Sequence, residues 1–498
     1  MPNIREGLAH EAFLKCINEL PQKALFDGLF DDKNGTQLLL EEIKESLEND
    51  TLLITKVGVR HLNSNVNKVA VITITDQEGN SSKYCLIGES LGMFTDPNAR
   101  PNIVENPYLA PNYISRNNNE SEGNAQRANL IPFYELGTLM GACEINKFMS
   151  ADEFNTYKFI YLLQSIQNNY FTIQQGIGIS INRLPNLTAQ GIATGESMLL
   201  SEKSLKKHDK KHKSIQGFFS SIPHVSKQNT AEAQHINVFF SSLISNIENA
   251  IQLSKIDKHF DISNLKKQLP EHQKSRHYLH RIHQSLEGFN NIISEEINRL
   301  SLKLGPIFEQ HQDGVLMMTG AVLDLFIDFE ENHLQYFDIK PENFLRDENG
   351  LVIGDNKTLA RVQDDGKVIN GSSHATYNLP AAEEGEFSGN AMLTSVQARQ
   401  LSRYQIGAML YNMTIGIPSS EFGDIAPHII VSGRLLDRGL KNEFDFNHPC
   451  FKTEIGQFLE SQIRRLTDVN PHARPELETV RERYHEFCQS LQQRYENN

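Results

Sequence analysis

The chain has 498 residues, of which 39% are hydrophobic and 22% charged. This composition is typical of a soluble globular protein, and the length exceeds what one core usually holds. The 62 acidic and 48 basic residues give a net charge of −14. An acidic chain is a poor candidate for a general nucleic-acid binder, so no nucleic-acid partner is expected.

Neither the cysteines nor the N-terminus indicate an exported disulfide-bonded protein. The five cysteines are scattered and form no C-x-x-C pair, which favours a reducing compartment and argues against a cysteine zinc site. The opening MPNIREGLAHEAF lacks the apolar core of a secretory signal. The most apolar run, residues 314–329, is too short to span a bilayer. We expect no membrane span, and either a cytoplasmic location or secretion into a host cell without a signal peptide.

The N-terminal part of the chain predicts helices followed by a small sheet. Residues 1–50 are expected to be mainly helical, because residues 36–49 place apolar side chains at helical spacing. Three runs rich in Val, Ile and Thr then predict an antiparallel sheet. These runs are residues 51–62, 66–77 and 83–90. An Asn-, Pro- and Gly-rich stretch, residues 95–126, predicts a mobile loop.

The middle of the chain predicts a return to helix. Residues 131–168 have helical spacing, with Ser150 as a cap before one of the helices. Two further strands are expected within residues 170–200. A Lys- and His-rich linker or exposed insertion is expected at 201–235, and a strongly helical block at 236–305.

Residues 336–345, YFDIKPENFL, contain the polar residues that bear most directly on function. Asp338 and Asn343 are five positions apart, with Lys340 between them, and Asp355 follows after RDENGLVIG. That stretch predicts strand, turn and strand, which would return Asp355 to the side of Asn343. Carboxylate and amide oxygens are ligands that suit Mg²⁺, so Asn343 and Asp355 are candidate metal ligands.

The D-I-K-P-E-N stretch resembles the catalytic loop of eukaryotic-type protein kinases, whose pattern H-R-D-x-x-x-x-N has the same Asp-to-Asn spacing. Four further stretches resemble kinase segments in the family's order. They are a long helix at 314–335, an activation-segment end at 372–384 (with Tyr377 and Pro380), a central helix at 401–418 (with Gly407, Leu410, Tyr411, Gly416 and Pro418), and a late motif at 466–480 (with Pro471, Arg474 and Pro475).

The resemblance implies an α+β, bilobal protein-kinase-like fold with a small β-rich N-lobe, a mainly helical C-lobe and a large helical insertion. The implied segments are 1–50 (N-terminal helices), 51–200 (divergent N-lobe), 201–313 (helical insertion with a basic linker) and 314–490 (C-lobe).

The same resemblance implies an ATP- and Mg²⁺-dependent Ser/Thr protein kinase acting on a protein substrate. Asp338 would orient the substrate hydroxyl, Lys340 would contact the transferred phosphate, and Asn343 and Asp355 would hold Mg²⁺. Lys340 favours Ser or Thr over Tyr substrates, because tyrosine-specific members usually replace this lysine.

A kinase also needs a strand lysine on the phosphates and a helix glutamate that holds it. Lys56 and Lys83 both lie on predicted strands, and neither stands in a V-A-I-K sequence. Glu153 or Glu144 is the candidate partner. No G-x-G-x-x-G loop precedes the sheet, and GESMLL at 195–200 is a candidate hinge for adenine.

Several positions depart from the family pattern. Tyr336 and Phe337 stand where the family has His and Arg, and D-N-K replaces D-F-G. Without that Arg, activity is expected not to depend on activation-loop phosphorylation. Ser402 replaces an Asp of the central helix, and Glu383 is the nearest partner for Arg474.

Other interpretations stay open. In the first alternative the protein is a pseudokinase scaffold whose 201–313 insertion binds a regulatory partner, with the basic segment 203–213 as a docking patch. In the second the kinase-like site acts on a small molecule or lipid, or transfers AMP. The Asn- and Gln-rich composition and the mosaic of motifs also resemble secreted bacterial effector kinases.

Overall fold

The chain forms two compact units, each built from three segments that alternate along the sequence. The first combines residues 1–142, 324–373 and 389–398, and the second combines 143–323, 374–388 and 399–498. The computed structural model describes residues 7–31, 34–47, 53–62, 68–90, 108–118, 126–164, 166–167, 250, 278–348, 350–354, 359–369, 392–416, 444, 446–468 and 470–497. Both helices and strands are well represented, so the fold is α+β, as expected.

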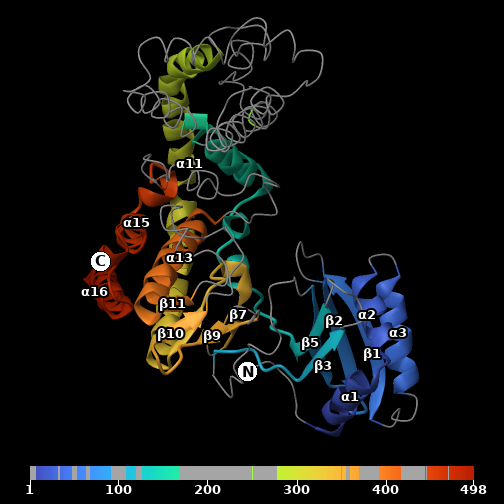
Figure 1. Ribbon diagram of the computed structural model, residues 1–498. Coiled ribbons are helices and arrows are strands. Elements are labelled where there is room, and N and C mark those ends of the chain that lie inside the picture. The colour runs from blue at the N-terminus through green and yellow to red at the C-terminus, as the bar shows by residue number, and fades with distance from the viewer. Residues whose placement is uncertain are drawn as a thin grey trace, which may run out of the picture. The chain divides into compact units, whose positions relative to one another are not determined.

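The first unit is built on a five-stranded antiparallel sheet in the order β1-β2-β3-β5-β4 (Figure 1). Its strands are β1 (Ile54–Leu62), β2 (Lys68–Asp76), β3 (Ser81–Ser90), β4 (Ile114–Asn118) and β5 (Gln126–Pro132). The first three strands confirm the predicted sheet. The turn at Asp76–Asn80 joins β2 to β3, where Gly79 takes a positive φ of 83°.

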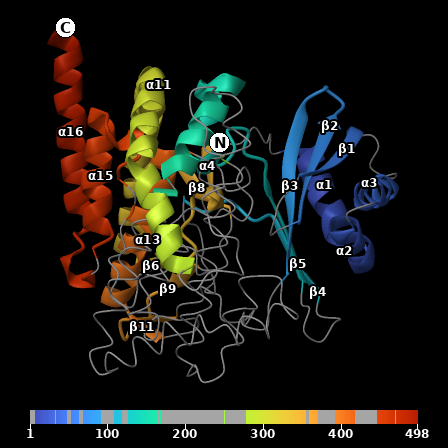
Figure 2. The ribbon, with the colours of Figure 1, turned by 90° about the horizontal axis from the view of Figure 1, so that it is seen from above.

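Three N-terminal helices cover one face of this sheet (Figures 1 and 2). They are α1 (Leu8–Glu19), α2 (Gln22–Phe30) and α3 (Gly35–Ser46). Helix was predicted here, and the helices and the sheet share one hydrophobic core. From the sheet that core takes Tyr84 and Leu86, and from α1 it takes Phe13 and Ile17. The predicted segment 1–50 is therefore structurally continuous with the sheet.

The opposite face of the sheet packs against a second, smaller cluster. Strand residues alternate between faces, so Cys85 and Ile87 point away from the helices. They pack with residues that come from three other parts of this unit. These residues are Ala110, Ile131, Tyr134, Leu345 and Val352. The last two belong to the hairpin formed by β7 (Phe344–Asp347) and β8 (Gly350–Ile353).

Two expectations for residues 95–168 were wrong. The predicted loop contains β4. The segment predicted as helix from residue 131 begins instead with the end of β5 and a turn, followed by the short helices α4 (Leu139–Ala142) and η2 (Ile145–Phe148). Residues 151–164 are helical. The alternation that marks a strand is missing from β5, because six of its seven residues are buried, on both faces of the sheet. The first turn after Ser150 confirms the predicted cap.

The second unit contains most of the long helix α11 (Tyr278–Glu331), which has 54 residues and includes Pro306. The middle of α11 packs on the helix at 151–164, where Tyr157 meets Phe308 at 5.7 Å between ring centroids. Gln167 donates to Ser294 Oγ at 2.6 Å. The helix predicted at 314–335 is confirmed to Glu331, as is the described part of the helical block 236–305.

Three C-terminal helices pack together, and all of their residues from Arg399 onward belong to the second unit. They are α13 (Ser395–Ile415), α15 (Glu454–Leu466) and α16 (Leu477–Asn497). Phe458 of α15 stacks on Phe487 of α16 at 4.1 Å. Gly407 of α13 allows a close approach to α15, since a Cβ there would lie 2.9 Å from Leu466 Cβ. The predicted helix at 401–418 is confirmed as far as Ile415, and Gly416 follows it with φ 71°.

The remaining regular elements are short. The strands are β6 (Leu334–Tyr336), β9 (Leu359–Arg361), β10 (Lys367–Ile369) and β11 (Met392–Thr394), and the 3-10 helices are η4 (Pro341–Asn343), η7 (Pro449–Phe451) and η8 (Pro471–Ala473). The strands expected in 170–200, the linker at 201–235 and the activation-segment end at 372–384 lie outside the described residues. Within the described helices, none is long and apolar enough to cross a membrane.

Candidate catalytic loop

The candidate site lies in the first unit, directly after the long helix ends. Helix α11 stops at Glu331, and His333 takes a positive φ of 56° to turn the chain into β6. Strand β6 pairs with β9, and Tyr336, Phe337 and Ile339 are each no more than 1% exposed. These apolar anchors fix the backbone on both sides of Asp338.

Asp338 and Asn343 are in direct contact across η4. The Asn343 Nδ2 donates to Asp338 Oδ2 at 2.8 Å and to the Asp338 carbonyl oxygen at 2.8 Å. It also donates to the buried hydroxyl of Tyr336 at 2.9 Å. Both Asp338 and Asn343 are 8% exposed, so these bonds form away from bulk water, where they are strongest. The amide therefore holds the Asp338 carboxylate in one orientation.

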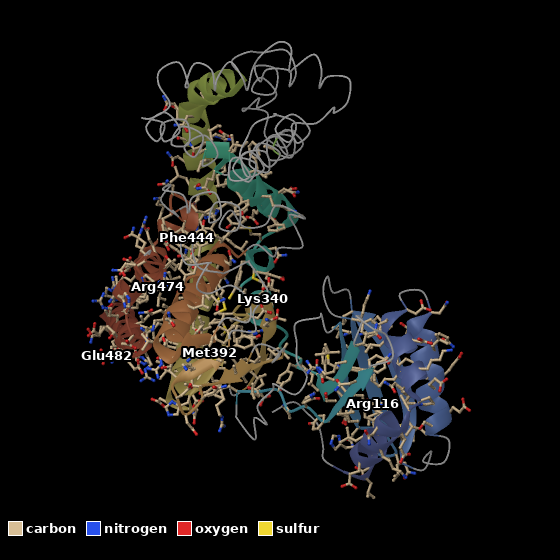
Figure 3. All side chains as sticks on the ribbon, viewed as in Figure 1. Arg116, Lys340, Met392, Phe444, Arg474 and Glu482 are labelled. Atoms are coloured by element: carbon tan, nitrogen blue, oxygen red, sulfur yellow. The ribbon has the colours of Figure 1, made fainter. Side chains whose placement is uncertain are left out.

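Lys340, labelled in Figure 3, forms an ion pair with the same carboxylate. Its Nζ lies 3.0 Å from Asp338 Oδ2, and its side chain is 22% exposed. The ammonium offsets the cost of burying the carboxylate and stays accessible to an approaching anion. The three predicted residues Asp338, Lys340 and Asn343 are thus brought together.

The hairpin β7–β8 has the predicted strand, turn and strand structure. Its end returns to the candidate loop, since the Gly354 N–H donates to the Asn343 carbonyl at 2.9 Å. Asp355 is the next residue in the sequence and lies outside the described residues, so its role as a metal ligand stays a prediction. The side chain of Asn343 itself suits a hard cation. Its hydrogen bonds to other described residues all come from the amide nitrogen, so the amide oxygen is the candidate ligand.

The hairpin is fastened to two other segments of the first unit. On the β8 side, the Ala110 N–H donates to Ile353 O at 3.1 Å, and the Ile353 N–H donates to Tyr108 O at 2.8 Å. On the β7 side, the Arg346 N–H donates to Gly137 O at 2.9 Å. These bonds connect the candidate loop to the segments before β4 and after β5.

The structure distinguishes the two candidate strand lysines. Lys83 lies on β3, the middle strand, and by alternation it shares a face with Cys85 and Ile87, which pack in the cluster that includes the hairpin. Lys56 lies on β1, the edge strand of the described sheet, and is exposed. Of the two candidate strand lysines, the strand order therefore favours Lys83, because its face of the sheet packs in the cluster that includes the hairpin.

The two predicted partner glutamates belong to the second unit and have local roles. Glu153 accepts hydrogen bonds from Ser150 N and Oγ at 2.8 and 2.7 Å, which is a capping box and lowers the pKa of its carboxyl. Glu144 lies 3.9 Å from Lys147. Lys83 is instead paired with Glu135, 2.6 Å away. The sequence does not identify Glu135, because its pattern predicts helix over residues 131–168 where the structure has a turn.

The predicted late motif forms a buried polar network in the second unit. Arg474 (Figure 3) is 4% exposed, and it donates to the carbonyl oxygens of Asp468 and Gln400, each at 2.9 Å. Its guanidinium lies 5.1 Å from the Tyr404 ring centroid. The suggested partner Glu383 lies outside the described residues.

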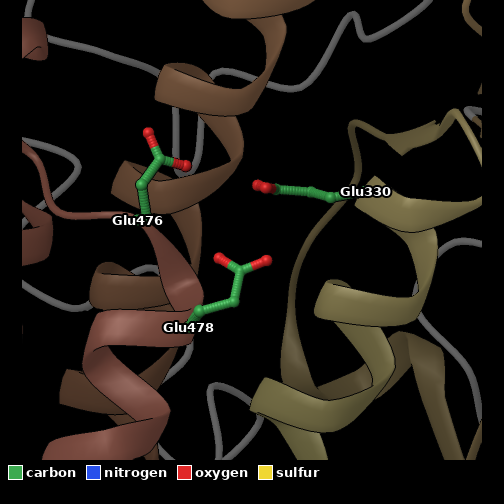
Figure 4. A group of neighbouring side chains, drawn as sticks. All are labelled: Glu330, Glu476 and Glu478. Atoms are coloured by element: carbon green, nitrogen blue, oxygen red, sulfur yellow. The ribbon is translucent and has the colours of Figure 1, made fainter.

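Two glutamates lie where the late motif leads into α16 (Figure 4). Glu476 precedes the helix and accepts hydrogen bonds from the buried Arg403. Glu478 lies in the first turn, where a carboxylate is favoured by the helix dipole. Both carboxylates therefore have structural explanations.

No protein-family model matches the chain, and no curated protein matches it.

Proposed function

We propose that the protein is an ATP- and Mg²⁺-dependent serine/threonine protein kinase with a bilobal kinase-like fold. The observation that carries this proposal is the Asp338–Lys340–Asn343 cluster, whose spacing matches the kinase catalytic loop and whose side chains are in contact. The hairpin that follows returns the chain to Asn343 immediately before Asp355. Four further kinase-like stretches in the family's order support the same function.

The chemistry asked of Asp338 suits its environment. Phosphoryl transfer needs a group that orients the attacking hydroxyl and can accept its proton. Asn343 donates to both Asp338 and Tyr336, so the Asp338 carboxylate is already oriented before a substrate binds. Less conformational entropy is then lost in reaching the transition state. Mg²⁺ would neutralise charge on the ATP phosphates, with Asn343 and Asp355 as its ligands. Lys340 would contact the transferred phosphate.

The decisive experiment is transfer of labelled phosphate from ATP with Mg²⁺. Wild type, Asp338→Asn and Lys340→Ala are assayed on the protein itself, generic acceptors and a cell lysate. The matched control is Asp365→Asn, the same change at a half-exposed carboxylate of the first unit. We expect Asp338→Asn to lower the rate on the order of 10²- to 10⁴-fold, as for loss of a general base.

Two results would reject the proposal. One is the absence of transfer by the wild type, with bound nucleotide or without it, which would favour the pseudokinase scaffold. The other is transfer that Asp338→Asn leaves at the level of Asp365→Asn. Transfer of AMP or labelling of a small molecule would change the reaction class.

A further inference from the structure

A four-residue turn, Tyr134–Gly137, connects β5 to α4 and carries Glu135. The Gly137 N–H donates to Tyr134 O at 3.0 Å, which closes the turn, and Gly137 has φ 70°. Residues with a side chain rarely adopt that conformation, so glycine stabilises this backbone. The turn is therefore a defined structural element.

On one side the turn is bonded to β3 at Lys83. The Phe133 N–H donates to Lys83 O at 3.1 Å, which extends the β3–β5 pairing by one bond. The Lys83 Nζ then reaches Glu135 Oε1 at 2.6 Å and lies 5.7 Å from the Phe133 ring centroid. Backbone and side chain of Lys83 are thus both held by the same short segment.

On its other side the turn is bonded to β7, three residues after Asn343. Arg346 donates from its backbone to Gly137 O at 2.9 Å and from Nη2 to Leu136 O at 2.5 Å. Thr138 and Leu345 form an antiparallel bridge next to these bonds. The turn therefore links the strand that carries Lys83 to the strand that begins at the candidate catalytic loop.

We propose that Glu135 is the positioning residue that holds Lys83 for the phosphates of the nucleotide. This inference rests on the proposed kinase function and names the residue that positions its nucleotide-binding lysine. In the kinase pattern the lysine is held by a glutamate on a helix. Here the carboxylate comes from a turn bonded to both β3 and β7, so Lys83 is positioned by the fold and needs no movement of a helix.

The exposure of the pair fits this role. The side chains of Lys83 and Glu135 are 40% and 61% exposed, so an anion can approach the ammonium while the carboxylate limits its rotamers. An exposed ion pair contributes little to the stability of the fold. Loss of Glu135 should consequently change nucleotide affinity more than folding.

The test compares Glu135→Gln, Glu135→Asp and Lys83→Ala with wild type. The control is Glu78→Gln, the same change in the turn between β2 and β3 of the same sheet. We measure kcat and KM for ATP in phosphate transfer, Mg²⁺–ATP affinity by calorimetry, and the unfolding midpoint. We expect Glu135→Gln to raise KM for ATP and the dissociation constant about 5-fold, as for an exposed ion pair, with kcat within about twofold.

Glu135→Asp should recover part of the affinity, and no variant should change the unfolding midpoint. The inference is overturned if Glu135→Gln binds ATP as wild type and Glu78→Gln do, or if its affinity and its unfolding midpoint fall together. A wild type that binds ATP without transferring phosphate refutes the kinase function, and calorimetry still decides the role of Glu135. A wild type that binds no ATP overturns both.

Discussion

Asn343 donates from one side-chain amide to both the carboxylate and the backbone carbonyl of Asp338, at 2.8 Å each. The two residues are equally buried, so the contact is protected from competing water. A carboxylate held in this way has few alternative orientations. Asn343 therefore has two separable roles, as the residue that orients Asp338 and as a candidate ligand for Mg²⁺.

Replacing Asn343 should lower both the rate of phosphate transfer and the stability of the fold. Asn343→Ala removes the hydrogen bonds to Asp338 and the candidate ligand oxygen, so phosphate transfer should fall by on the order of 10²-fold or more. Stability should fall by about 1–3 kcal/mol, because the variant loses the buried hydrogen bonds that Asn343 donates to Asp338 and Tyr336. Asn80→Ala, in the turn after β2, is the control and should keep full activity. Transfer and urea unfolding are measured on both, and an active Asn343→Ala would contradict the assignment.

Two glycines offer a matched test of helix packing in the second unit. A Cβ on Gly407 would lie 2.6 Å from Thr467 Cγ2, whereas a Cβ on Gly314 of α11 would meet nothing within 4 Å. Gly407→Ala should therefore destabilise the protein by about 1–3 kcal/mol through overpacking between α13 and α15. Gly314→Ala should stabilise it by roughly 0.5–1 kcal/mol, because alanine is the better helix former. Equal effects in thermal unfolding would contradict the described packing.

Two buried histidines make the second unit sensitive to acid. Burial lowers the pKa of His311 to about 4, despite its hydrogen bond with Cys143 O, and burial together with the nearby His311 lowers the pKa of His448 to about 3. The unfolded chain takes up these protons near pH 6.5, so stability is complete above that pH and falls as the pH drops toward the folded values. Each histidine should cost about 2 kcal/mol at pH 5 relative to pH 7.5.

The measurement is urea unfolding at pH 7.5 and pH 5.0. In the wild type the Cys450 N–H donates to His448 Nδ1, and the side-chain oxygen of His448→Asn can accept the same hydrogen bond. This variant should remove about half of the stability loss between the two pH values. His485→Asn changes an exposed histidine of α16 and should leave that loss unchanged. The same pH dependence in wild type and His448→Asn would be inconsistent with a neutral buried His448.

The guanidinium of Arg474 should not be replaceable by an ammonium. It donates in two directions, to Asp468 O and Gln400 O, and faces the Tyr404 ring, a planar arrangement that lysine lacks. Arg474→Lys should destabilise the protein by about 2 kcal/mol, since buried carbonyls lose their donors. Arg483→Lys on the exposed side of α16 should stay within about 0.5 kcal/mol. Thermal unfolding of both variants decides, and equal midpoints would contradict the network.

Much of the local structure could be predicted from the sequence, because it depends on short-range patterns. The Val-, Ile- and Thr-rich runs of β1, β2 and β3, the helical spacing of residues 36–49, and the hairpin after Asn343 all follow from residue types, side-chain periodicity and turn residues. The short spacing of Asp338, Lys340 and Asn343 is compatible with their contact, since a 3-10 turn of three residues leaves them little separation. The residues at the centre of the candidate site could therefore be identified from one short segment of the sequence.

Tertiary structure decided the elements whose patterns are not local. Strand β5 is buried on both faces and loses the period of two, and β4 is a short polar edge strand, so both escaped prediction. The choice of Lys83 over Lys56 depends on strand order, and the partner Glu135 depends on a turn that bridges β3 and β7. Such pairings join residues far apart in the chain, and no periodicity within one segment encodes them.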